Sequence, residues 1–202
     1  MCEKKRNWLF RKLPCGRLIK LDVDVFYQLQ DKSIGFSEKK KKSAQVILFL
    51  SKSKEPLKTI ALARYILKTP KGLVADHINR DIFDNRGSNL RNVNYRQNAL
   101  NRSCHGCIGV AFIRSSKRCF RYKAQHWPPK GKRLSFSVPV SPAGLALAAF
   151  ARDKFVLQCG DEDYAPLNFP FCRYEPFKTA LLQTDLNEFK RVCNSAQKKP
   201  AE

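Results

Sequence analysis

The sequence has few acidic side chains for its length, and this shortage sets the first limit on what the protein binds. Its 202 residues carry 17 Asp and Glu against 39 Lys and Arg, which gives a formal net charge of +22. A strongly cationic surface attracts polyanions, so nucleic acid is the first candidate partner. Basic side chains outnumber acidic ones in each of residues 1–60, 61–103 and 104–170, so we expect phosphate contacts along several segments.

Long apolar runs are also missing. The longest, from Val46 to Leu50, is too short to cross a bilayer, so no membrane partner is expected. The basic start, Met1 to Arg6, is followed by no apolar stretch of the kind that a signal peptide needs. The eight cysteines are therefore expected to be reduced thiols in an intracellular compartment. With 43% apolar residues, the chain can still bury a core.

Composition and apolar periodicity predict an α+β protein in four segments. Residues 1–60 form a basic mixed segment, in which a turn at residues 14–16 precedes a strand over 17–21 and Asp22 can cap a short helix. An apolar segment over 45–51 follows. Residues 59–67 are also apolar, but their period does not distinguish a strand from a helix.

Residues 104–170 alternate between apolar and polar side chains like paired strands. In residues 119–126, Tyr122 and Ala124 fall on one face, while Arg121 and Lys123 fall on the other. Residues 133–138 repeat this pattern after a Pro-Pro-Lys-Gly turn, and Ser141-Pro142 begins a helix that ends at Gly160. We therefore expect a three-stranded sheet with one packed helix. Residues 171–202 are expected to add one more helix and a polar tail, its apolar face made by Leu182, Leu186, Phe189 and Cys193.

Residues 73–102 are unusually rich in amide side chains, with seven asparagines around one Asp76-His77 pair. Residues 74–78 and 90–93 read as strands, and the intervening loop carries the Asp, Asn and Gly residues that hold turns. Asn94 can cap a following helix, and Gln97 can complete a capping box. This stretch therefore predicts a strand, an ordered loop, a strand and a helix.

The side chains of this unit suit phosphodiester hydrolysis. A carboxylate from Asp76 and an amide oxygen from Asn98 are hard ligands appropriate to Mg²⁺ or Mn²⁺. A histidine titrates near neutrality, so His77 can take the proton of an attacking water. Because adjacent strand residues point to opposite faces, this scheme requires Asp76 and His77 to lie at a strand end.

The stretch "DHINRDIFDNRGSNLRNVNYRQNALNR", residues 76–102, resembles the His-Asn-His (HNH) motif of homing endonucleases, in the variety that ends in asparagine. The resemblance implies a ββα-metal core over residues 61–103, with His77 as general base. It implies Asp76 and Asn98 as metal ligands and Asn89 as the residue that holds the imidazole.

The same resemblance extends to the loop and to the segment that precedes it. Asn85 and Arg86 match the loop that shapes the site, and Arg86 is the candidate for a DNA contact there. Ala63 stands where the family usually has a histidine. This difference concerns the residues that support the site more than the reaction itself.

A second resemblance covers the next segment. The stretches "GVAFIR" (109–114), "FRYKAQ" (120–125) and "YAPLNFP" (164–170) are similar to the APETALA-type DNA-binding domain of ethylene-response factors. That family lays its sheet in the DNA major groove, although Tyr122 replaces a usual tryptophan. The resemblance implies five basic DNA contacts, namely Arg114, Arg118, Arg121, Lys123 and Arg133.

Three smaller features favour structural interpretations. His105 and His126 are expected to be structural or solvated. The pair Cys104 and Cys107 has the spacing of zinc ligands, but no second pair follows, so zinc is not expected. The acidic run at residues 161–163 follows a glycine in a turn and is expected to be solvated.

The sequence therefore predicts a monomeric, divalent-metal-dependent endonuclease of homing type that cuts double-stranded DNA and needs no small-molecule cofactor. One alternative is a non-catalytic APETALA-like regulator with a decayed nuclease unit. A second is an RNA-directed protein, which competition between duplex DNA and RNA would reveal.

Overall fold

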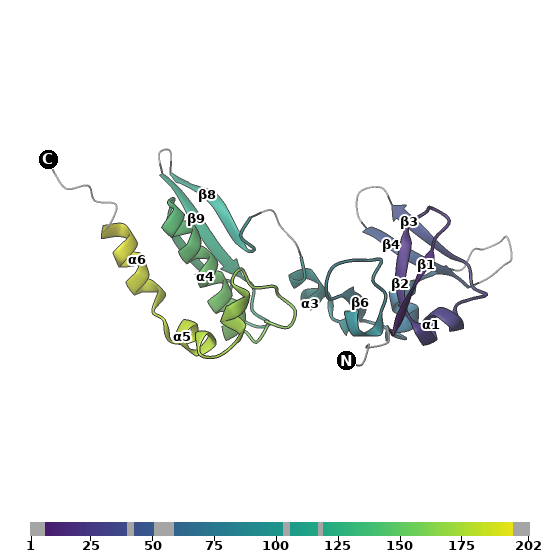
Figure 1. The fold of residues 1–202 in the computed structure, drawn as a ribbon. Coiled ribbons are helices and arrows are strands. Elements are labelled where there is room, and N and C mark those ends of the chain that lie inside the picture. Colours follow the sequence, from purple (N-terminus) through teal and green to yellow (C-terminus); the bar gives the residue numbers. More distant parts are fainter. Residues whose placement is uncertain (1–6, 40–42, 51–58, 103–105, 117–118, 196–202) are drawn as a thin grey trace, which may run out of the picture. The chain divides into compact units, whose positions relative to one another are not determined.

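The chain divides after residue 99 into two compact units (Figure 1). The computed structural model describes residues 7–39, 43–50, 59–102, 106–116 and 119–195. Small antiparallel sheets and short helices alternate along the chain, so the protein has the expected α+β class.

The first unit begins with a hairpin and a three-stranded sheet. Strands β1 (Trp8–Lys12) and β2 (Leu18–Asp22) pair across the predicted turn, where Gly16 takes a positive φ of 84°. Helix α1 (Val23–Gln28) follows, and β3 (Ile34–Lys39), β4 (Ser43–Phe49) and β5 (Thr59–Ala61) form the second sheet. Helix α2 (Leu62–Ile66) follows β5 without a break, so the ambiguous segment 59–67 is a strand and then a helix.

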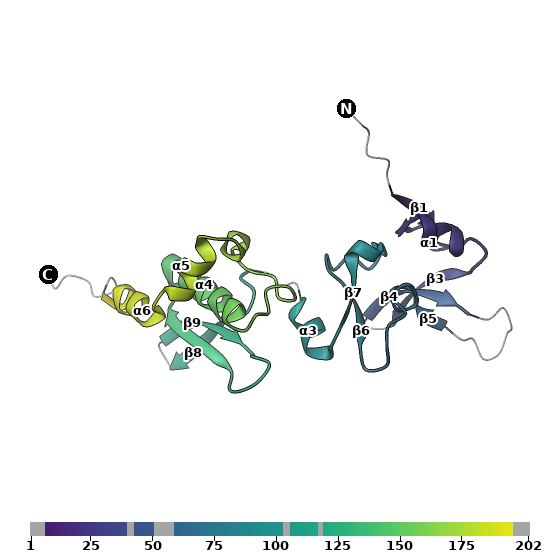
Figure 2. The ribbon, with the colours of Figure 1, turned by 90° about the horizontal axis from the view of Figure 1, so that it is seen from below.

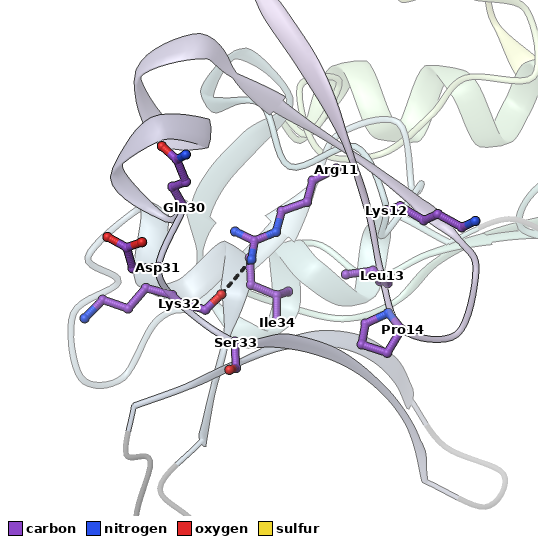
Figure 3. Close-up of a pocket in the computed structure, with 9 residues that line it drawn as sticks. All are labelled: Arg11, Lys12, Leu13, Pro14, Gln30, Asp31, Lys32, Ser33 and Ile34. Atoms are coloured by element: carbon purple, nitrogen blue, oxygen red, sulfur yellow. Dashed lines mark hydrogen bonds between the residues drawn. The ribbon is translucent and has the colours of Figure 1, made fainter.

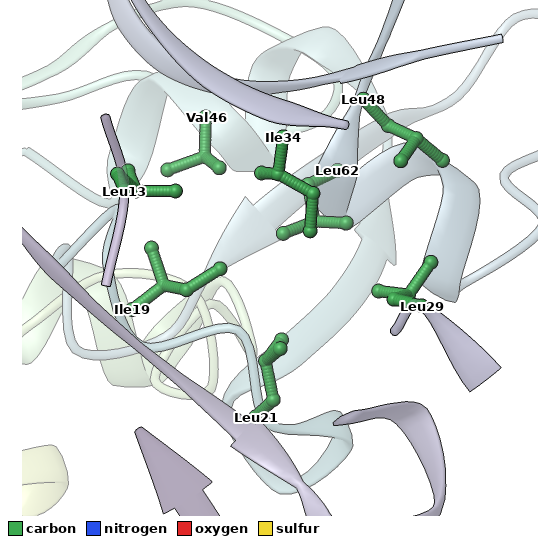
Figure 4. Close-up of a cluster of buried hydrophobic side chains, with 8 residues drawn as sticks. All are labelled: Leu13, Ile19, Leu21, Leu29, Ile34, Val46, Leu48 and Leu62. Carbon is green, nitrogen blue, oxygen red and sulfur yellow. The ribbon is translucent and has the colours of Figure 1, made fainter. Parts of the chain in front are cut away.

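The core of this unit does not stop at residue 60. Leu62 packs with seven buried residues from the N-terminal segment: Leu13, Ile19, Leu21, Leu29, Ile34, Val46 and Leu48 (Figure 4). Leu62 and the partly buried Phe83 thus share one core with the described part of the N-terminal segment.

The HNH-like stretch forms the elements that the sequence predicts. Strand β6 (Val74–His77) pairs antiparallel with β7 (Leu90–Val93), and a 3₁₀ turn, η1 (Gly87–Asn89), lies between them. Helix α3 (Tyr95–Leu100) follows. The capping box is confirmed, since the Asn94 backbone N–H donates to Gln97 Oε1 at 2.9 Å and the Gln97 N–H donates to Asn94 Oδ1 at 2.8 Å.

The N-terminal hairpin supports the loop between β6 and β7. The Lys20 N–H donates to Phe83 O at 2.8 Å, and the Asn85 N–H donates to Lys20 O at 2.9 Å. Asp22 stands at the N-cap position of α1 as expected, but its carboxylate accepts the Gly87 N–H at 2.7 Å and makes no side-chain bond to the helix. Residues 19–22 therefore hold the loop in place as well as covering the core.

The second unit is a three-stranded antiparallel sheet covered on one face by a helix (Figures 1 and 2). Its strands are β8 (Val110–Ser116), β9 (Cys119–His126) and β10 (Leu134–Pro139), with β9 in the centre. Helix α4 (Pro142–Gln158) starts as predicted, with Ser141 Oγ accepting the Gly144 N–H at 2.9 Å. Ala124, Phe136, Val138, Ala148, Ala151 and Phe155 form the core between helix and sheet.

The C-terminal segment belongs to this second unit. After the 3₁₀ turn η2 (Pro170–Arg173) come two helices, α5 (Phe177–Gln183) and α6 (Leu186–Ser195), where the sequence predicts one. Asp185 Oδ1 accepts the Asn187 N–H at 2.8 Å, which begins a new helix and separates Leu182 from Leu186. The Lys154 ammonium group on α4 donates to Leu182 O at 2.6 Å and Thr184 O at 2.5 Å, fixing the end of α5.

Candidate functional site

His77 is the last residue of β6, at the strand end that the sequence scheme requires. The chain turns immediately afterwards, with the Arg80 N–H donating to His77 O at 2.9 Å and Arg80 adopting a φ of 66°. Asp76 pairs across the hairpin with Arg91, and His77 pairs with Leu90. The Asp76 carboxylate and the His77 imidazole thus come from consecutive residues at the end of the strand.

Asn85 is the side-chain partner of the imidazole. Its Oδ1 lies 3.3 Å from His77 Nε2, while its Nδ2 donates to Ile82 O at 2.9 Å. Because the amide N–H points to a carbonyl, Oδ1 faces the ring and accepts the Nε2–H. In the neutral ring, Nδ1 is then the nitrogen that takes a further proton.

Burial lowers the pKa of His77 below its ordinary value of 6.5, against the opposing influence of the Asn85 bond and the Asp76 carboxylate. The ring is therefore neutral at pH 7. A general base must be in this state to accept a proton.

Asn89, expected to hold the imidazole, makes hydrogen bonds within the loop. Its Oδ1 accepts the Asn79 N–H at 3.0 Å, and its Nδ2 donates to Asn79 Oδ1 at 2.9 Å and to Asp84 O at 2.8 Å. Both amide hydrogens are used, since η1 turns Asn89 beneath the loop. The printed sequence gives Asn85 only as a residue of the loop, yet its side chain contacts the imidazole.

Asp76 is buried and paired with Arg91. Both Nε and Nη2 of the guanidinium lie 2.9 Å from Asp76 Oδ2. The carboxylate suits Mg²⁺ or Mn²⁺ as a hard donor, but a bound cation would share it with this positive charge. Asn98 lies half-buried in α3, and its approach to Asp76 stays a prediction.

The Arg86 guanidinium forms an ion pair within the loop. Its Nε donates to Asp84 Oδ1 at 2.8 Å and its Nη2 donates to Asp84 Oδ2 at 2.7 Å. This fork-to-fork hydrogen bond lowers the pKa of Asp84 below its usual range. The guanidinium is therefore neutralised within the loop, which weakens the expectation that it contacts DNA.

The sheet of the second unit presents a basic face. Lys123 pairs with Ser137 and Ala111 across the sheet, on the face opposite to buried Ala124. Arg121 shares this face by strand alternation and donates to Ser137 O at 3.1 Å.

The other expected DNA contacts do not all lie on this face. The guanidinium of Arg133 lies 5.2 Å from the ring centre of exposed Trp127, just beyond the paired ends of β9 and β10. Arg114 pairs with Phe120, so it lies on the opposite face from Arg121, and its Nε donates to Ser116 O at 3.2 Å. Arg118 lies outside the described residues.

A buried polar cluster forms where the sequence predicts solvated groups. His126 is 3% exposed and Asp161 is 4% exposed, and His126 Nε2 lies 2.8 Å from Asp161 Oδ2. The structural expectation for His126 is confirmed, whereas the solvated expectation for Asp161 is wrong. The two residues are 35 positions apart in the sequence, so no local sequence pattern predicts their contact. Cys104 and His105 lie outside the described residues.

The first unit also has an open hollow of about 550 Å³ beside β1 (Figure 3). Arg11 lies within it and donates to Lys32 O at 2.7 Å and to Leu29 O at 2.5 Å. Because both carbonyls belong to the segment that joins α1 to β3, Arg11 ties β1 to that segment.

Within the described part of the chain, no helix combines the length and apolarity needed to cross a membrane. No protein-family model, curated protein or solved structure matches the chain.

Proposed function

We propose that the chain is a divalent-metal-dependent DNA endonuclease of homing type, with His77 as its general base. The observation that carries this proposal is a neutral, hydrogen-bonded imidazole next to a carboxylate at the end of β6. The hairpin, ordered loop and capped helix supply the local framework that the resemblance to HNH nucleases implies.

In this scheme, His77 Nδ1 takes one proton from an attacking water. The water oxygen forms a new bond to phosphorus as the phosphodiester P–O bond breaks, and the leaving oxygen takes a proton from solvent. Mg²⁺ or Mn²⁺, when bound by Asp76 and Asn98, would polarise the scissile phosphate. Asn85 keeps the ring oriented, and Arg91 holds the Asp76 carboxylate.

The acid side of the pH–rate profile tests the role of His77. Because burial lowers its pKa below 6.5, more than half of the His77 rings are still neutral at pH 6.5. We expect the single-turnover cleavage rate at pH 6.5 to stay above half of its plateau value and to fall further at lower pH, where His77 becomes protonated. A rate that has already halved at pH 6.5 would exclude this group as the base.

Double-stranded DNA would bind the basic sheet face of the second unit. Arg121 and Lys123 supply positive charge there, and Arg133 with Trp127 adds a flat cation–aromatic pair just beyond the strand ends. Phosphate contacts of this kind release counterions and make binding salt-dependent.

The salt dependence of DNA binding tests this surface. Lys123→Ala removes one cation from the proposed face, and we expect the slope of log K against log salt concentration to become shallower by about one. Arg114→Ala is the matched control, since it removes a cation from the opposite face of the same sheet. Fluorescence anisotropy on a labelled duplex measures both slopes, and equal losses in the two variants would contradict the assignment of the face.

A second candidate is a DNA-binding regulator with an inactive nuclease unit. The ion pair between Arg91 and Asp76 favours it, since the guanidinium already neutralises the carboxylate expected to bind metal. Incubating supercoiled plasmid with the purified chain and Mg²⁺ or Mn²⁺ separates the two. Nicked or linear product supports the nuclease, whereas retained DNA binding without any cleavage supports the regulator.

A further inference from the structure

Three potential metal ligands that take no part in the proposed nuclease chemistry meet in the second unit. His126 is the last residue of β9, Cys159 follows the final turn of α4, and Asp161 lies in the turn beyond Gly160. One ligand atom from each lies within 4.8 Å of the other two. The three segments therefore bring an imidazole, a thiol and a carboxylate to one point.

The local backbone fixes this meeting. The Cys159 N–H donates to Phe155 O at 3.2 Å, and the Asp161 N–H donates to Val156 O at 3.1 Å. Gly160 takes a φ of 64°, the left-handed conformation that lets the chain turn back at the helix end. The two side chains from this turn are thereby positioned against His126 before any ligand binds.

The chemistry of the three groups favours zinc over magnesium. A thiolate and an imidazole are ligands for Zn²⁺, whereas Mg²⁺ prefers oxygen ligands. Zinc bonds of about 2.0–2.3 Å place its tetrahedral ligands roughly 3–4 Å apart. In the structure, His126 Nε2 lies 2.8 Å from Asp161 Oδ2, and all three ligand atoms lie within 4.8 Å of one another. The spacing that zinc requires falls between these two distances. Small side-chain rotations would therefore bring the three atoms into coordinating positions.

We propose that His126, Cys159 and Asp161 bind one Zn²⁺ ion. His126 and Asp161 are buried, while Cys159 is only half-buried, so the thiol side admits the water that completes a tetrahedron. The carbonyl end of α4 adds a favourable partial negative charge for a cation. On binding, the thiol proton leaves to solvent and imidazole Nε2 becomes a ligand, its ring proton carried on Nδ1.

The ion would fasten the end of α4 to the central strand of the sheet. In the metal-free chain a hydrogen bond joins His126 to Asp161, in addition to the apolar packing between α4 and the sheet. Zinc bound to the folded state alone would therefore raise the stability of the second unit. This site is independent of the proposed nuclease chemistry, because it shares no residue with it.

Titration of the reduced, metal-free full-length chain tests the proposal. We expect one equivalent of Zn²⁺ to compete with a chromophoric chelator, and Co²⁺ to give a thiolate charge-transfer band with the visible spectrum of a tetrahedral ion. Cys159→Ser should remove the charge-transfer band and weaken Zn²⁺ binding by more than roughly the ten- to hundredfold that loss of an outer-shell partner costs. Zinc should raise the melting temperature of the wild type and leave that of Cys159→Ser nearly unchanged.

Two cysteine variants provide matched controls. Cys119→Ser removes a half-buried thiol from the far end of β9, and Cys107→Ser removes a thiol from the short motif before β8. Both should retain the band and the affinity. Cys159→Ser preserves size, and its circular dichroism without metal checks its fold. No Zn²⁺ binding by the wild type, or binding lost in Cys107→Ser but kept in Cys159→Ser, would overturn the proposed site.

Discussion

Replacing His77 by alanine is expected to reduce Mg²⁺-dependent cleavage of duplex DNA by about 10²–10⁴-fold, the usual contribution of a general base. In the proposed mechanism the imidazole at the end of β6 is the base, so its loss would leave the attacking water without a positioned proton acceptor. Single-turnover cleavage of a plasmid by wild type and variant, at saturating protein, measures the effect on the chemical step.

The same variant should bind DNA as the wild type does. His77 lies in the first unit and the proposed basic face lies in the second, so the affinity and its salt slope are expected to persist. This separates loss of chemistry from loss of fold. Equal cleavage by both proteins would point to a contaminating nuclease and remove His77 from the mechanism.

Local sequence signals account for the elements that were predicted well. The reciprocal Asn94–Gln97 cap, the strand over residues 90–93 and the Ser141 cap depend on side chains within a few residues of each other. Strand alternation likewise separates Lys123 from Ala124 without knowledge of the fold. Such patterns are set by backbone geometry and need no tertiary partner.

Features that depend on distant residues could not be predicted from local patterns. The placement of Arg114 opposite Phe120 follows from the register of β8 and β9, which single-strand alternation does not specify. Burial of Asp161 depends on a histidine on another strand. Neither contact leaves a periodic pattern in the sequence.

The asparagine-rich loop shows the same limit within the candidate site. Several amides lie at similar spacings from His77, and the path of the loop decides which one meets the ring. That path depends on the backbone bond from Asn85 to Lys20, in a hairpin more than sixty residues earlier. The sequence therefore places Asp76 and His77 next to each other but does not specify which amide contacts the imidazole.

The second large effect is expected at Asp153, a fully buried carboxylate on α4. Its Oδ2 accepts the Phe169 N–H at 2.8 Å, and its Oδ1 accepts the Asn168 N–H at 3.0 Å and the Asn168 Nδ2–H at 3.1 Å. Asn168 in turn donates to Ile108 O at 3.1 Å and accepts the Ile108 N–H at 2.6 Å. One carboxylate thus joins α4 to the segment after it and, through Asn168, to the approach to β8.

Asp153→Ala is expected to lower the free energy of unfolding of the second unit by about 3–5 kcal/mol. The substitution leaves the backbone N–H groups of Asn168 and Phe169 without their acceptor in a buried site, and it removes the buried ion pair with Arg152. Domains are stable by only about 5–15 kcal/mol, so much of the stability of this unit depends on the one side chain. Urea unfolding followed by circular dichroism measures the change.

Asp163→Ala provides the comparison, since it removes the same group from an exposed position in the same unit and should cost no more than about 0.5 kcal/mol. Asp153→Asn should fall between the two, because its amide keeps one acceptor oxygen but turns an N–H toward existing donors. If Asp153→Ala unfolds at the same urea concentration as Asp163→Ala, the carboxylate is not what holds residues 168 and 169 against α4. The position of α4 against the sheet would then depend on apolar packing alone.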